Sequence, residues 1–161
     1  MTENSITYQA PYLLLLAELA PEPSAETRCF CPQTMRHGEG ARAHLDVGGT
    51  NSLTANDLVL EVECAPSSTF GLFFFGERPA QFPVGEGLRC VRAPRRLGPA
   101  VLVNPAGEVD VPVDFFAGNL GSSGVALAGQ QVLFQFWFRH LGPGGQSSFA
   151  FSDAIAVSLG S

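Results

Sequence analysis

Short stretches of alternating apolar and polar residues recur along most of this chain. In residues 41–47, ARAHLDV, the apolar side chains fall at every second position, and residues 57–64, DLVLEVEC, repeat the arrangement. Strict alternation predicts β-strands with one buried face, because successive side chains of a strand point to opposite sides. Residues 69–76, TFGLFFFG, are apolar along their whole length, which predicts a strand that is buried on both faces.

The later part of the chain continues in the same way. Residues 100–103 and 108–115 flank the turn-forming sequence NPAG and are predicted to form a hairpin-like pair. Residues 132–140, VLFQFWFRH, and 149–159, FAFSDAIAVSL, complete the set of predicted strands. The long 3.6-residue apolar period of a helix is missing throughout. The sequence therefore predicts an all-β fold, a mostly antiparallel β-sandwich of jelly-roll or immunoglobulin-like type.

Residues 1–28 do not share this pattern. They join a polar start to a leucine run and the linker-like stretch APEPSAETR, so we expect a short irregular segment, either a linker or a leader remnant. Residues 29–161 are then expected to form one β-sandwich domain. The apolar run at 10–20 is shorter than the roughly 20 residues of a membrane helix. It makes a poor signal peptide, because no Lys or Arg precedes it.

Charge narrows the choice of partners. The chain has a net charge of -6, and all nine of its basic residues are arginine. An acidic chain repels a phosphate backbone on average, so nucleic acid is not an expected partner. The basic residues cluster at one place in the sequence, at Arg89, Arg92, Arg95 and Arg96. This cluster predicts either an anion-binding patch or an ordinary solvated surface, and the solvated surface is the simpler interpretation.

Cys29, Cys31, Cys64 and Cys90 allow three complete disulfide pairings. Cys29 and Cys31 are too close in an extended chain to pair easily, so each is expected to reach Cys64 or Cys90 instead. Disulfides are typical of an oxidising compartment, which suggests an extracellular or cell-surface location. The Cys-Phe-Cys spacing lacks the spacer of a zinc site, and no phosphate-binding motif is complete. We therefore predict no metal and no cofactor.

The sequence contains the residue types of a catalytic triad but no motif that brings them together. His140, Asp153 and one of Ser147, Ser148 or Ser152 supply the residue types of a Ser-His-Asp triad. The Gly-x-Ser-x-Gly turn that presents a nucleophile is absent, and such triads are recognised by geometry rather than by order in the chain. The sequence therefore predicts no catalytic residue, and we expect a protein that is not an enzyme.

The two rows of residues in 132–140 differ in character. One row is apolar, with Val132 and three phenylalanines, and the other holds Gln135, Trp137 and Arg139. In 149–159 the odd positions are mostly large and apolar, and the even positions are Ser or Ala. If these strands pair with both apolar rows in the core, the row with Trp137 lies beside the small residues.

That arrangement has two interpretations. A shallow surface around Gln135, Trp137 and Arg139 suits a sugar, whose ring packs on the indole while the amide and guanidinium form hydrogen bonds. Alternatively, another part of the chain, such as residues 1–28, covers this face and Trp137 packs beneath it. Asp153 falls on the apolar row, so we expect it at an edge of the sandwich, accepting loop N–H groups or an arginine.

Five motifs occur in an order that resembles a known domain: GTNSLTANDLVLEV, FGLFFFG, GEGLRCV, FQFWFRH and SFAFSDAIAV. Together with RCFCP at 28–32, they resemble an uncharacterised domain at the C-terminus of large secreted proteins of planctomycetes and myxobacteria. The resemblance covers residues 29–158. His140 and Ala150 depart from the Asp and Asn that are usual in that family. The resemblance implies secretion and an appended, non-catalytic role, and it carries over no ligand-binding residue.

These observations lead to one leading hypothesis and one alternative. The leading hypothesis is a secreted, non-catalytic structural or interaction module whose partner is a glycan or another extracellular protein. The alternative is a carbohydrate-binding module that uses the strand face around Trp137. The sequence indicates neither the ligand nor the oligomeric state.

Overall fold

The computed structural model describes residues 42–117, 120, 126–142 and 144–161, together with the backbone of 27–30. The regular elements of this part of the chain are β-strands, and the paired strands all run antiparallel. They are β1 (Thr27–Phe30), β2 (His44–Gly48), β3 (Val59–Glu63), β4 (Phe70–Gly76), β5 (Pro79–Val84), β6 (Gly87–Val91), β7 (Arg95–Leu102), β8 (Val109–Pro112), β9 (Gln131–Leu141) and β10 (Ser147–Ser158). The predicted all-β fold is confirmed.

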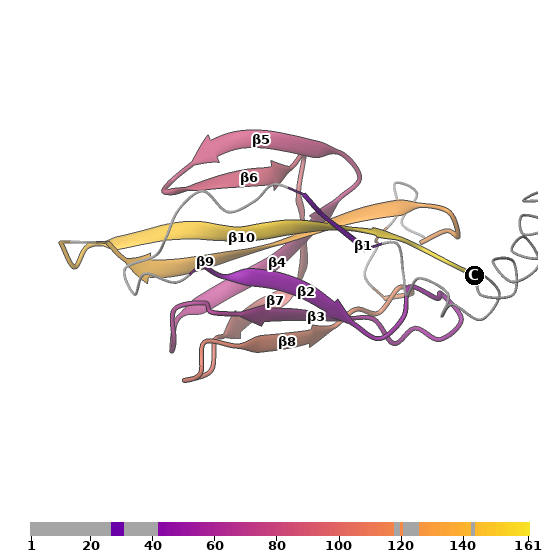
Figure 1. The fold of residues 1–161 in the computed structure, drawn as a ribbon, viewed down its shortest axis with the longest axis horizontal. Helices are drawn as coiled ribbons and strands as arrows, with labels where there is room; N and C mark the ends of the chain where they lie inside the picture. The colour runs from indigo at the N-terminus through magenta and orange to yellow at the C-terminus, as the bar shows by residue number, and fades with distance from the viewer. Residues whose placement is uncertain (1–26, 31–41, 118–119, 121–125, 143) are drawn as a thin grey trace, which may run out of the picture.

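The strands form three layers (Figure 1). A five-stranded sheet, in the order β1-β10-β9-β4-β7, packs against a three-stranded sheet, in the order β2-β3-β8. The β5–β6 hairpin lies on the opposite side of the five-stranded sheet, above β10 and β9 in this view. The first two layers form the predicted sandwich, and the hairpin adds a third layer.

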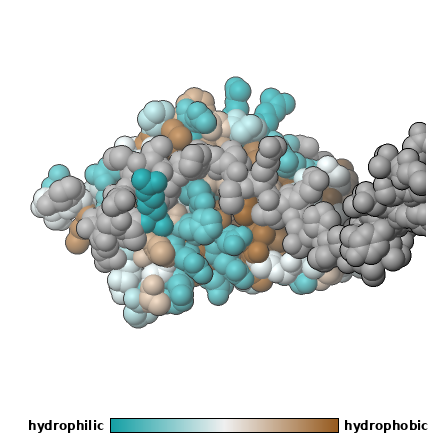
Figure 2. Space-filling model, viewed as in Figure 1, coloured by the Kyte–Doolittle hydropathy of each residue, from teal (hydrophilic) through white to brown (hydrophobic). Residues whose placement is uncertain are grey.

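The main core fills the space between the two sheets. It is built from the inward rows of both sheets, as period-2 alternation requires. Its large, fully buried members include Leu45, Leu60, Val62, Phe73, Phe75, Phe134, Phe136, Phe138 and Ile155. On the outer side of the three-stranded sheet, His44, Asp46 and Glu63 face solvent. Figure 2 shows a mostly hydrophilic surface over β2 and β3.

β4 is buried on both faces, as its continuous apolar sequence predicts. Phe73 and Phe75 enter the main core, and Phe74 packs on the other side with Val91 of the hairpin. Both neighbours of β4 pair with it, β9 on one side and β7 on the other. Gly71 allows a close approach here, because a Cβ at that position would lie 2.2 Å from the Phe136 ring.

The predicted hairpin-like pairing of 100–103 with 108–115 is wrong. The turn itself exists, since Gly107 N–H donates to the Asn104 carbonyl at 3.0 Å. However, β7 pairs with β4 in one sheet, and β8 pairs with β3 in the other. The turn therefore carries the chain from one layer of the sandwich to the other. A turn sequence gives a change of direction and does not specify which strands pair across it.

The predicted face of 149–159 is wrong for its first half. β10 carries an extra residue between Phe151 and Ala154 relative to β9, which shifts the register and forms a β-bulge. Before the bulge, Phe149 and Phe151 point to the hairpin side. After it, Ile155 and Val157 point into the main core. The row beside Trp137 therefore holds Phe149 and Phe151 and not small residues only.

Candidate functional site

The outer face of the five-stranded sheet is covered by the β5–β6 hairpin at one end. There Val91 of β6 packs with Leu133, Phe151 and Ala156 of the sheet in a second apolar cluster. The interpretation in which part of the chain covers this face is thus correct over these residues, although the covering element is the hairpin. Residues 1–28 were the suggested cover; of these, 1–26 lie outside the described residues, and Thr27 and Arg28 belong to β1, which pairs with β10 within the sheet.

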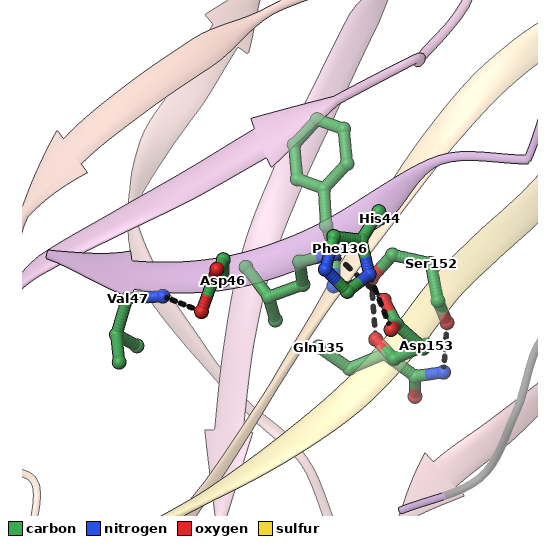
Figure 3. A network of polar contacts seen from close by, with 8 residues as sticks. His44, Asp46, Val47, Gln135, Phe136, Ser152 and Asp153 are labelled. Carbon is green, nitrogen blue, oxygen red and sulfur yellow. Dashed lines mark hydrogen bonds and ion pairs between the residues drawn. The ribbon is translucent and has the colours of Figure 1, made fainter. Parts of the chain in front are cut away.

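Gln135 lies beneath the hairpin and is completely buried. Its Oε1 accepts from Cys90 N–H at 2.9 Å, and its Nε2 donates to the Leu88 and Ser152 carbonyls, both at 2.9 Å. The amide therefore joins β9 to β6 and β10, and Figure 3 shows its bond to Ser152. Because these bonds engage both ends of the amide, Gln135 stabilises the structure and does not form part of a ligand surface.

Trp137 packs against the second apolar cluster and is only partly buried. Its ring packs beside Phe149, with centroids 5.9 Å apart. It also lines an open hollow of about 250 Å³, which we call the Trp137 groove. The groove is lined by Leu72, Phe74, Arg89, Pro94, Arg96, Trp137 and Phe151. The structure thus gives the indole a mostly apolar surrounding with two guanidinium groups.

The two arginines of the groove come from strands that the sequence pattern does not connect with Trp137. Arg89 belongs to β6, and its guanidinium carbon lies 5.2 Å from the centroid of the Phe82 ring. Arg96 belongs to β7, and its Nε donates to the Gly98 carbonyl at 2.8 Å. Both belong to the basic cluster seen in the sequence. That cluster was the available signal, but its position next to Trp137 depends on the pairing of β7 with β4.

Arg139, the last residue of the predicted row, is exposed at the far end of β9. It does not line the Trp137 groove. The three residues predicted as one binding row therefore occupy three environments: Gln135 is buried, Trp137 lines the groove and Arg139 faces solvent. Only Trp137 stays at the centre of the candidate site.

Asp153 lies at the β10 bulge and links the two sheets. Its Oδ1 accepts from Leu45 N–H of β2 at 2.7 Å, and its Oδ2 lies 2.7 Å from His44 Nδ1 (Figure 3). Asp153 was expected to accept loop N–H groups or an arginine; its partners are instead a strand N–H and a histidine, both on β2. The carboxylate satisfies a strand N–H that would otherwise lack a partner at the sheet edge.

The residue types that could form a Ser-His-Asp triad do not come together in the structure. Asp153 contacts His44, whereas His140 is buried with its Nε2 2.9 Å from Glu86 Oε2. Ser152 Oγ accepts from Phe136 N–H at 3.0 Å and donates to the Asp153 carbonyl at 2.6 Å. Its hydroxyl is therefore committed to backbone partners and is not directed at a histidine.

The cysteines and candidate metal ligands are spread over the fold. Cys90 is fully buried and packs against Ala154, Cys64 is exposed, and Cys29 lies on β1 opposite Ile155. Cys31 lies outside the described residues. Among the residues that the structure describes, no three His, Cys, Asp or Glu side chains group as a metal site. The same residues include no helix long and apolar enough to span a membrane.

No protein-family model, curated protein or solved structure matches this chain.

Proposed function

We propose that this chain is a secreted interaction module without catalytic activity, and that the Trp137 groove is its binding surface. The observation that supports this proposal is the position of Trp137. The single Trp of the chain is partly open to solvent, in a hollow flanked by Arg89 and Arg96. An aromatic ring with polar groups placed beside it in a concave, mostly apolar surface is typical of a ligand site.

Within this proposal, a carbohydrate is the ligand that the groove suits best. The face of an indole packs against the C–H surface of a sugar ring, and guanidinium groups donate several hydrogen bonds to hydroxyl oxygens. The groove is open and smaller than the roughly 300–1,000 Å³ of enclosed small-molecule pockets. It is therefore shaped for part of an extended ligand such as one ring of a glycan. A protein partner is the second candidate for the same surface.

The first prediction is that Trp137 reports and supports glycan binding. A glycan array should give specific binders, and titration of a binder should change the fluorescence of Trp137, the single Trp of the chain. Trp137→Ala should weaken binding by at least about tenfold, because central aromatic contacts carry much of the affinity of a site. Phe116→Ala is the matched control, since Phe116 is an exposed aromatic residue outside the groove.

Each result of the binding experiment points to a different conclusion about the ligand. Binding that survives Trp137→Ala would place the ligand elsewhere on the molecule. An array without binders would contradict the carbohydrate proposal and direct the search to extracellular proteins. Trp137→Phe should be tested in parallel, because it keeps an apolar ring beside Phe149 and preserves the packing if the alanine variant unfolds.

The proposal that the module is not an enzyme is supported by the surroundings of its polar residues. The His44–Asp153 pair is accompanied by Ser152, whose hydroxyl bonds only backbone atoms. A nucleophile needs a base within hydrogen-bond reach, and Ser152 is held by other partners. Turnover of any substrate in a broad hydrolase panel would overturn this part of the proposal.

The second prediction concerns the cysteines. We propose that Cys90 forms a disulfide with a cysteine of the segment that contains Cys29. Cys90 packs on Ala154, and the same residue of β10 pairs with Phe30 of β1. Alkylation of the unfolded, unreduced protein should label fewer than four cysteines by mass spectrometry. Cys90→Ser should release a thiol from its partner, whereas Cys64→Ser at an exposed position is the control.

Reduction should also lower the melting temperature, because removal of a native disulfide from a small domain costs about 2–5 kcal/mol. Four labelled cysteines in the unreduced protein would contradict the proposed bond. They would also remove one of the two arguments for secretion, since the other rests on the resemblance of the sequence motifs.

A further inference from the structure

A second hollow, which we call the arginine cavity, lies next to the Trp137 groove. Its volume is about 440 Å³, and it is lined by Gly76, Glu77, Arg78, Arg92, Ala93 and Arg95. Arg78 and Arg92 are exposed, and a backbone hydrogen bond from Arg92 N–H to the Arg78 carbonyl, at 2.9 Å, fixes their separation. Three arginines and one glutamate thus line one hollow.

The carboxylate does not balance the arginines. Glu77 Oε1 lies 3.3 Å from an amino nitrogen of Arg95, whose guanidinium also lies over the Phe75 ring, at 4.9 Å from its centroid. Arg95 is therefore held in place by these two contacts. Arg78 and Arg92 remain as positive charges around the cavity, where the field favours an anion.

The two hollows follow each other along the same pair of segments. β4 contributes Leu72 and Phe74 to the groove and Gly76 to the cavity, and the neighbouring segment 92–96 contributes to both. Phe74 and Gly76 are two residues apart on one strand, which corresponds to about 7 Å. Trp137 lies opposite Leu72, and Gly76 is four residues farther along β4, at about 13 Å, so a ligand of two or more sugar rings is needed to reach both hollows.

The arginines of the molecule are concentrated at these hollows. Among the side chains that the structure describes, five of the seven arginines line one or the other, whereas only one of the ten acidic residues does so. In a chain with a net charge of -6, this is a local reversal of sign. Arg89 belongs to this set, and its Nε bonds to no described residue. Charge-assisted bonds to a ligand oxyanion suit such groups.

We propose that the ligand of the Trp137 groove is a short acidic oligosaccharide. One of its rings packs on Trp137, and its carboxylate or sulfate group binds between Arg78 and Arg92. This inference rests on the function proposed above and adds the charge of the ligand. The planar guanidinium matches the paired oxygens of a carboxylate or sulfate, so the cavity selects acidic over neutral sugars.

The observations favour a saccharide over single-stranded nucleic acid. Proteins that bind single strands stack successive bases on several aromatic residues along an extended basic channel. Here one indole and one compact basic cluster lie on a chain that is otherwise acidic. A short ligand meets only this basic cluster, since surface charges beyond about 8 Å are screened at physiological salt.

The test compares matched acidic and neutral sugars by Trp137 fluorescence. Trigalacturonate against its methyl ester tests a carboxylate, and lactose 3′-sulfate against lactose tests a sulfate. The acidic member of at least one pair should bind about tenfold more tightly or better, the effect of one charge-assisted contact. That preference should fall as sodium chloride is raised. A short oligothymidylate serves as the nucleic-acid probe.

Charge-removing variants locate the anion. Arg92→Gln should remove most of the preference for the acidic sugar over the neutral sugar. Arg78→Gln is a second variant at an exposed position. Arg42→Gln is the matched control, because Arg42 is exposed and precedes β2 on the other sheet. Equal effects of Arg92→Gln and Arg42→Gln would overturn the role of the cavity.

The remaining outcomes separate the inference from the proposed function. If both members of each pair bind equally well, the anion inference is overturned and the Trp137 proposal stands. If no saccharide binds, the carbohydrate function itself is contradicted. Tighter binding of oligothymidylate than of any saccharide would overturn the choice of ligand class in favour of nucleic acid.

Discussion

Gln135 shows how one polar residue can distinguish a packed sheet face from a face that is open to a ligand. Alternation along β9 correctly places it on the opposite face from Phe134 and Phe136. The pattern does not reveal that β6 passes over this position and offers both a donor and an acceptor to its amide. A buried amide with satisfied partners stabilises the layer that covers it.

The third prediction is that Gln135→Leu destabilises the protein by about 1–3 kcal/mol, the usual cost of leaving buried polar groups without partners. Leucine is similar in size, but it cannot bond Cys90 N–H or the carbonyls of Leu88 and Ser152. Urea unfolding measures the change. Gln131→Leu is the control on the same strand, because Gln131 is exposed. Equal stability of the two variants would show that these bonds contribute nothing.

Among the elements, β10 deviates most from its sequence pattern. Its odd positions look like one apolar row, but the bulge divides them between two cores. The residues at the bulge, Ser152 and Asp153, each bond a strand backbone N–H, from Phe136 and Leu45. An alternation read across a bulge assigns half of the strand to the wrong face, because one inserted residue inverts the side-chain order.

The β5–β6 hairpin depends on glycine at its turn. Gly85 has a φ of 60°, and a Cβ there would lie 2.5 Å from the Phe149 ring. Phe149 in turn packs beside Trp137. The turn therefore seats on β10 only because this position carries no side chain, and the contact extends from the hairpin to the indole of the candidate site.

The fourth prediction follows from this contact. Gly85→Ala should destabilise the protein by more than the roughly 1–2 kcal/mol of left-handed backbone strain, since the methyl group also displaces Phe149. Gly98→Ala is the matched control, because Gly98 has a φ of 67° and open space around its Cβ position. Only Gly85→Ala should shift the emission of Trp137. Equal melting temperatures and unchanged emission would contradict the proposed seating.

At the scale of the whole molecule, two carboxylates hold loops outside the strands. Hydrogen bonds from the Thr50 hydroxyl and N–H lower the pKa of Asp57 from its usual 3.8. Hydrogen bonds from Phe116 N–H and the Asn56 side chain lower the pKa of Asp114 in the same way. The bond between Asn56 and Asp114 needs the folded chain, because these residues are 58 positions apart.

The fifth prediction is a loss of stability in acid. Because the folded pKa values lie below 3.8, this stabilisation is complete above that pH and disappears as the pH falls through the folded values. Asp57→Asn should therefore be less stable than the native protein at pH 7, and the difference should narrow at pH 3. Thermal melts at both pH values test this. Asp110→Asn, at an exposed position on β8, controls for the loss of one charge.

The sequence by itself determined the class of fold and the burial of most strands. Alternation and continuous apolar runs depend on side-chain direction in a strand, which is a local property and is visible in β2, β3 and β4. Trp137 and the cluster of arginines were also evident from the sequence, because residue type and spacing along the chain are local properties. Neither needed knowledge of the partners of each strand.

Only the tertiary structure decided which strands pair, where β10 changes face and what covers the row of Gln135, Trp137 and Arg139. These are long-range choices: Arg89 and Arg96 reach Trp137 because the hairpin folds over β10 and β7 pairs with β4. Local preferences do not fix such contacts, because the packing of whole layers sets them. The strand around Trp137 was thus evident from the sequence, and its groove arose from the fold.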